Sequence, residues 1–154
     1  IISQRPDYSF VFTGPEDDGF RQHRIHSLKN AYFTGQKKVD ELPAYITAYD
    51  VCINPQMVND ITDGNYPLKI DEYLAMGKPT VATSTHTMRH IFANHTHLAT
   101  TPEEWLSAID RAVTEADDKK LAKQRIAFAE THSWGHSVKK IYDIIDNFLK
   151  EKAT

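Results

Sequence analysis

Residues 67–83 read PLKIDEYLAMGKPTVAT, a helix pattern followed directly by a strand pattern. The pattern predicts a helix over residues 67–76, and Gly77 stands in the position of a C-terminal cap. The β-branched run at residues 79–83 then predicts a strand. A helix joined to a strand in this way is one unit of an α/β fold, so this stretch indicates the fold class.

The same alternation extends outward from this stretch in both directions. Strands are predicted at residues 8–13, 31–34, 51–54, 79–83 and 97–99. Helices are predicted at residues 20–28, 39–49, 67–76, 87–92, 101–115, 119–131 and 134–150. Thr101, with Glu104 three residues later, predicts a capping box at the start of the 101–115 helix. We therefore expect an α/β fold, a Rossmann-like parallel sheet flanked by helices, with at least four parallel strands in the domain and a helical C-terminal tail. Residues 1–154 are expected to form a single domain.

Composition limits the classes of protein that the chain can belong to. The 154 residues are 40% hydrophobic and carry 18 basic against 21 acidic residues, which gives a formal net charge of −3. This balance gives no support to nucleic-acid binding or to an anionic membrane surface. No apolar run approaches the ~18 residues of a membrane span. We expect a cytoplasmic chain, with a peripheral membrane association left open for the full-length protein.

Two further features concern Cys52 and the start of the chain. A single cysteine excludes an internal disulfide, and its apolar neighbours predict a buried, inert thiol. Ile1 begins a segment that resembles the tail of a helix followed by a loop, and no initiating Met precedes it. The chain is therefore expected to be part of a longer polypeptide.

The junction between residues 56–66 and the helix after them is the strongest candidate for a binding site. Ligands bind beyond the carboxyl ends of the strands in an open parallel sheet, and the polar 56–66 segment is the longest loop there. Pro67 is expected at the first helical position, so that the amides of residues 68–70 point into the crevice and favour phosphate. Lys69 adds a positive charge, and Glu72, one turn deeper, can accept hydrogen bonds from a ribose diol. The alternative is an i,i+3 ion pair between Lys69 and Glu72 on a solvated helix face.

Residues 67–83 resemble the donor-site signature of glycosyltransferases of the GT-B architecture, above all the large group-1 family that uses nucleotide-activated sugars. Other segments agree in order along the chain, at residues 10–15, 32–35, 41–45, 48–55 and 132–134. The resemblance implies the C-terminal, donor-binding half of a two-domain enzyme of cell-surface polysaccharide biosynthesis. The N-terminal acceptor domain, and the first strand with its arginine and lysine, would precede Ile1, so no catalytic residue is assigned.

The resemblance also implies a role for individual residues. Lys69 would bind the diphosphate and Glu72 the nucleotide ribose, whereas Asp63 and Gly64 occupy the place of an acidic-glycine pair that faces the donor sugar. That match is imperfect because the family has Glu at this place with a slightly shorter spacing, and an ordinary turn remains the alternative. The implied donor-binding set is Gly35, Gln36, Lys37, Asp63, Gly64, Pro67, Leu68, Lys69 and Glu72. The donor would be UDP- or GDP-linked, with no cofactor and no metal ion.

Other functions have weaker support. His86 and His90 are spaced for one helix face, but a zinc site needs further ligands with ordered partners. No nucleophile elbow, dinucleotide fingerprint or P-loop is present.

A non-catalytic α/β module, either receiver-like or a glycosyltransferase-like domain without activity, is the remaining alternative. Asp50 and Lys78 precede their strands, which places them at the wrong end of the sheet for a receiver. We expect Val138, Ile141, Tyr142 and Ile145 of the C-terminal helix to pack on the sheet of this chain; the alternative is a contact with a missing domain.

Overall fold

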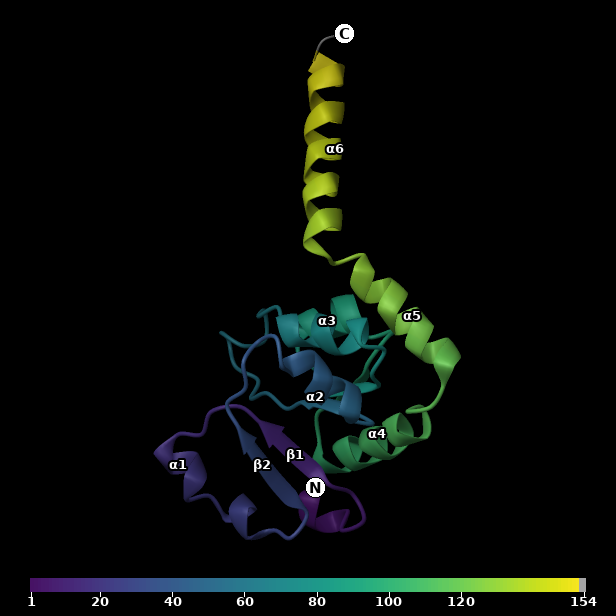
Figure 1. Cartoon of the computed structure of the whole chain (residues 1–154). Coiled ribbons are helices and arrows are strands. Elements are labelled where there is room, and N and C mark those ends of the chain that lie inside the picture. The colour runs from purple at the N-terminus through teal and green to yellow at the C-terminus, as the bar shows by residue number, and fades with distance from the viewer. Residues whose placement is uncertain (153–154) are drawn as a thin grey trace. The chain divides into compact units, whose positions relative to one another are not determined.

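The computed structural model describes residues 1–152 and has an α/β architecture in which every strand pairs in parallel (Figure 1). The chain divides into two compact units, Ile1–Ala48 and the residues from Tyr49 onward. The predicted fold class, a Rossmann-like α/β fold of parallel strands flanked by helices with a C-terminal helix, is confirmed. The strands fall into two hydrogen-bonded sheets, one in each unit.

The first unit is built around the two-stranded sheet. Its elements are the 3₁₀ turn η1 (Ile2–Gln4), β1 (Phe10–Thr13), α1 (Asp18–Arg21), the 3₁₀ turn η2 (Arg24–Ser27), β2 (Ala31–Gly35) and α2 (Leu42–Ala48). Phe10 pairs with Ala31 and Phe12 with Phe33, and the two phenylalanine rings stack 5.1 Å apart. Figure 1 shows β1 and β2 side by side. Apart from Phe10 and Ile46, the apolar side chains of this unit are partly buried or exposed.

The helix predicted at residues 20–28 is wrong, because the chain forms two short turns there instead. Asp17 caps α1 by accepting a hydrogen bond from the Phe20 amide at 2.7 Å. His23 then adopts an extended conformation, and its Nδ1 accepts a hydrogen bond from the Ile25 amide at 3.3 Å. Side chains that bond to nearby amides in this way compete with the continuous helical ladder, so the segment restarts as η2.

The second unit contains a three-stranded sheet of order β3-β4-β5. Its elements are β3 (Cys52–Asn54), α3 (Leu68–Ala75), β4 (Thr80–Thr83), the π-helical turn η3 (Met88–Phe92), β5 (His97–Ala99), α4 (Pro102–Thr114), α5 (Lys119–Glu130) and α6 (Trp134–Lys152). Cys52 pairs with Thr80, and Val81 pairs with His97. All four residues of β4 are buried, as expected for a central parallel strand.

The core of this unit lies where α3 packs against α5 and against β4. Figure 1 shows α3 beside α5. It consists of Ile70, Leu74, Ala82, Met88, Phe92 and Ala129. Cys52 is buried as predicted, and burial raises the pKa of its thiol from 9.0 to about 12, against a smaller lowering by Lys78. Few thiolates form at neutral pH under these conditions, which agrees with an inert thiol.

The C-terminal end of α3 is closed by Gly77, as predicted. Gly77 has a φ of +72°, a left-handed conformation that a residue with a Cβ rarely adopts. A Cβ at this position would lie 3.1 Å from the Ala122 Cβ of α5. The Gly77 and Lys78 amides donate to the carbonyl oxygens of Leu74 and Tyr73, so the last turn of the helix is satisfied.

The predicted capping box of α4 is also present. The Thr101 hydroxyl accepts a hydrogen bond from the Glu104 amide at 3.3 Å, and the Glu104 carboxylate accepts one from the Thr101 amide at 3.2 Å. At the other end of α4, Glu115 binds the buried guanidinium of Arg125 and lies 3.0 Å from His97 Nε2. These contacts connect α4, α5 and the start of β5.

The apolar face of α6 does not pack on the sheet. All described side chains of α6 are exposed, including Trp134 at 85% and Tyr142 at 63%. The expectation that this face packs on its own sheet is therefore wrong for the described chain. The exposed apolar side chains are Val138, Ile141, Tyr142, Ile144, Ile145, Phe148 and Leu149. Within residues 1–152, none of the helices combines the length and hydrophobicity needed to cross a membrane.

Candidate functional site

The 56–66 loop leaves the carboxyl end of β3 and leads into α3, as predicted. Its central turn is fixed by Asn59, whose side-chain oxygen accepts hydrogen bonds from the Ile61 and Thr62 amides at 3.0 and 2.9 Å. The Thr62 hydroxyl in turn accepts a hydrogen bond from the Asn59 amide at 3.0 Å. The loop therefore has local structure of its own, although most of its residues are exposed.

Asp63 anchors this loop to the segment that follows β4. Its Oδ1 accepts a hydrogen bond from the His86 amide at 2.7 Å, and its carbonyl oxygen accepts one from the Thr87 amide at 3.3 Å. The Asp63 carboxylate therefore links two loops at the carboxyl ends of the neighbouring strands β3 and β4. This contact uses one of the oxygens that the resemblance directed toward a donor sugar.

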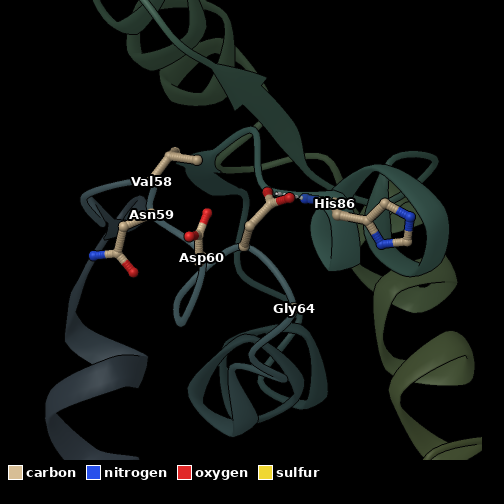
Figure 2. Close-up of a pocket in the computed structure, with 6 residues that line it drawn as sticks. Val58, Asn59, Asp60, Gly64 and His86 are labelled. Atoms are coloured by element: carbon tan, nitrogen blue, oxygen red, sulfur yellow. Dashed lines mark hydrogen bonds between the residues drawn. The ribbon is translucent and has the colours of Figure 1, made fainter.

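An open cavity of about 580 Å³ lies beside this contact between Asp63 and His86. It is lined by Val58, Asn59, Asp60, Asp63, Gly64 and His86. Figure 2 shows Asn59 and Asp60 projecting from the loop, while the His86 imidazole points away from them. The imidazole instead lies against that of His90, with ring centres 4.2 Å apart. The structure thus brings Asp63 and Gly64 to one cavity, whose lining does not include Lys69 or Glu72.

The start of α3 differs from the prediction by one position. Pro67 is the N-cap, with φ −87° and ψ 87°, and the helix begins at Leu68. The Ile70 amide donates to the Pro67 carbonyl oxygen at 2.8 Å, so it is not available to a ligand. Among residues 1–152, the amides of Leu68 and Lys69 find no acceptor, and they carry the positive end of the helix dipole.

The side chains of Lys69 and Glu72 are exposed on the surface of α3. The alternative of an i,i+3 ion pair is not seen, because no salt bridge joins Lys69 to Glu72 in the part of the chain that the structure describes. A cation and a carboxylate one turn apart are thus both accessible from solvent.

A second polar cluster lies beside the same helix turn. Asp71 accepts hydrogen bonds from Tyr66 Oη at 2.6 Å and from His132 Nδ1 at 2.8 Å, through different carboxylate oxygens. Burial, followed by the hydrogen bond and charge of Asp71, raises the pKa of Tyr66 well above its ordinary value. Tyr66 therefore remains a neutral hydrogen-bond donor at physiological pH.

Gly35, Gln36 and Lys37 belong to the first unit, at the end of β2. Gly35 has a φ of +68°, and its carbonyl oxygen accepts a hydrogen bond from the Gly14 amide at 3.1 Å. Lys37 Nζ lies 5.1 Å from the centre of the Tyr45 ring. The glycine thus allows the sharp turn that ends the strand, as its place in the sequence suggested.

The structure also bears on the metal hypothesis for His86 and His90. Their rings are close, but within residues 1–152 no group of three or more His, Cys, Asp or Glu side chains is arranged to hold a metal ion.

A family comparison assigns the chain to an enzyme class. Residues 1–115 match the family model described as glycosyl transferases group 1, which is well over half of the chain. The chain belongs to the group 1 glycosyltransferases. This membership excludes the receiver-like alternative and agrees with the parallel α/β fold.

A curated relative supports the same family. The group 1 chain is 28% identical over 138 residues to TuaH of Bacillus subtilis (strain 168), which is named as a glycosyltransferase of teichuronic acid biosynthesis. The match covers 85% of this chain and 34% of the relative. The chain therefore spans about a third of the length of the curated relative that it matches.

The sequence did not predict two contacts in this region, that of His86 with Asp63 and that of His132 with Asp71. The sequence suggests His86 as a metal ligand and as part of the 84–86 segment at the carboxyl end of a strand, but it does not predict that the His86 amide donates to Asp63. His132 was noted only beside Trp134, and its partner Asp71 lies 61 residues away in sequence. No local pattern signals either contact, because both depend on the tertiary fold.

Proposed function

We propose that the start of α3 binds the diphosphate of a nucleotide-activated sugar, UDP- or GDP-linked, for glycosyl transfer. The observation that carries the proposal is the unpaired, exposed Lys69 beside the two amides of Leu68 and Lys69 that lack an acceptor among residues 1–152. A helix N-terminus with an added cation favours phosphate oxygens. In a group 1 glycosyltransferase, a nucleotide-sugar donor is the phosphate ligand that fits this arrangement.

Glu72 is assigned to the nucleotide ribose. Its carboxylate can accept two hydrogen bonds from a vicinal diol, and it lies one helical turn beyond Lys69 on the exposed surface of α3. A carboxylate is unsuited to the phosphates themselves because like charges repel. The spacing of the two residues thus assigns the diphosphate to the first turn of the helix and the ribose to the next.

In the proposed reaction, the bond between the sugar's anomeric carbon and the diphosphate oxygen breaks. A new bond forms between that carbon and an acceptor hydroxyl oxygen, whose proton is released to water. The departing nucleoside diphosphate gains negative charge, and Lys69 with the neighbouring amides stabilises that charge. We propose that this occurs without a metal ion or other cofactor, in the cytoplasm, with an acceptor-binding domain of the whole protein. We propose that Asp63 and Gly64, which line the cavity, contact the sugar.

The acceptor is proposed to be a growing cell-surface polysaccharide. The support is the relative TuaH, whose name refers to teichuronic acid biosynthesis. A glycosyltransferase-like domain without activity is the alternative, and it predicts no useful affinity for a nucleotide diphosphate.

The test is a calorimetric titration of the protein at its natural length with UDP and GDP. Lys69→Ala and Glu72→Ala are each expected to weaken binding about 10- to 100-fold, because each removes a charged hydrogen-bonding group. Lys119→Ala and Glu103→Ala are matched controls, since both residues are exposed in the first turns of other helices. These controls should bind like the unmodified protein. Absence of binding at millimolar nucleotide would favour the inactive alternative.

A further inference from the structure

The cluster of Tyr66, Asp71 and His132 joins three separate parts of the second unit. Tyr66 ends the 56–66 loop, Asp71 lies in α3, and His132 lies between α5 and α6. Tyr66 Oη also lies 3.3 Å from His132 Nδ1, so each of the three side chains contacts the other two. An ionised carboxylate only accepts hydrogen bonds, so both Tyr66 and His132 donate to Asp71.

This cluster rests on the aromatic part of the core. The His132 ring lies edge-on to Phe128 and Phe92, with ring centres 4.6 and 5.8 Å apart. The Tyr66 ring lies 5.5 Å from Phe92, which is fully buried. Close packing against Phe92 and Phe128 therefore fixes the position of the cluster, whereas the Tyr66 side chain remains 37% exposed.

Asp71 occupies a sensitive position for a phosphate ligand. It lies in the first turn of α3, between the proposed diphosphate ligand Lys69 and the proposed ribose ligand Glu72. A free carboxylate there would repel a diphosphate. Two charge-assisted hydrogen bonds hold this carboxylate toward His132 and Tyr66 instead, and they also fix the turn whose amides are open.

We propose that Tyr66 and His132 are positioning residues for the nucleotide site, acting through Asp71 on the first turn of α3. The inference rests on the proposed function and deepens it, because it assigns residues outside the ligand contacts. The hydrogen bonds, rather than the packing of the rings, carry the effect.

Three variants test this by calorimetry with UDP and GDP on the protein at its natural length. His132→Phe keeps a ring against Phe92 and Phe128 but removes the donor, and it is expected to weaken binding about tenfold. Tyr66→Phe removes the other donor at a partly exposed position and should weaken binding by a similar factor, about tenfold. His132→Asn loses the ring but keeps an N–H near the position of Nδ1, and it should bind within about threefold of the unmodified protein.

The order of the two His132 variants separates positioning from packing. A packing role predicts that Phe is tolerated and Asn is not, which would overturn the proposal. His136→Phe is the matched control, because His136 is an exposed histidine of the adjacent helix α6. It should leave the affinity unchanged. Unchanged affinity in both His132→Phe and Tyr66→Phe would also overturn the proposal.

A second measurement keeps this test independent of the proposed function. If the unmodified protein binds neither nucleotide, the proposed function fails, and hydrogen exchange then tests the positioning role in the ligand-free protein. Exchange of the Ile70 amide, which donates to the Pro67 carbonyl oxygen in the first turn of α3, should become about tenfold faster in Tyr66→Phe and His132→Phe. It should stay unchanged in His132→Asn and His136→Phe. Equal exchange in all four variants would overturn the inference.

Discussion

The two ends of helix α3 are held by different forces. At the C-terminal end, Gly77 is buried against Ala122, and the guanidinium of Arg125 donates to the Gly77 carbonyl oxygen at 3.4 Å. At the N-terminal end, Leu68 is 68% exposed, and hydrogen bonds to Asp71 hold the first turn. Close packing fixes one end, whereas the other keeps amides and charged side chains open to solvent. The difference indicates that stability is concentrated at the C-terminal end, and we propose that the N-terminal end binds the ligand.

Two leucines of the same helix give the largest expected contrast in stability. Leu74 is fully buried in the core, so Leu74→Ala should lower the free energy of unfolding by about 2–5 kcal/mol. Leu68→Ala, at the exposed N-terminal end of α3, should change the free energy of unfolding by less than about 0.5 kcal/mol. Urea denaturation followed by circular dichroism measures both. Equal losses for the two variants would contradict the difference between the two ends.

A smaller effect is expected from Gly77→Ala. The left-handed backbone and the 3.1 Å approach to the Ala122 Cβ both oppose a side chain at this position. The free energy of unfolding should fall by about 1–3 kcal/mol. Gly135→Ala is the control, because a Cβ there meets nothing within 4 Å and alanine favours the helix. A Gly77→Ala protein as stable as the unmodified one would show that the approach of Gly77 to Ala122 does not fix the C-terminal end of α3.

Local sequence signals predicted much of this structure. The Gly77 cap and the box of Thr101 and Glu104 were predicted because capping chemistry depends on residues a few positions apart. The strand at residues 97–99 was predicted with the bounds that the structure gives. The family resemblance of residues 67–83 led to the enzyme class that the family comparison shows.

The remaining features depend on contacts between distant residues or on competing local bonds. Asp71 and His132 meet only because α5 packs on α3, which no periodicity reveals. The apolar face of α6 has helical spacing, but spacing does not specify what covers it. At residues 20–28, the capping bond of His23 outweighed a helix pattern. The roles of Lys69 and Glu72 stay predictions.

The central claim is that the open end of α3 receives the diphosphate, and NMR of the backbone amides tests it most directly. The Leu68 and Lys69 amides should shift most on addition of UDP or GDP, and they should not shift with uridine or guanosine. The Gly77 and Lys78 amides, already bonded to carbonyl oxygens, should stay in place in both titrations. Phosphate-dependent shifts confined to the open end would support the account. Nucleotide binding that leaves Leu68 and Lys69 unshifted would contradict it.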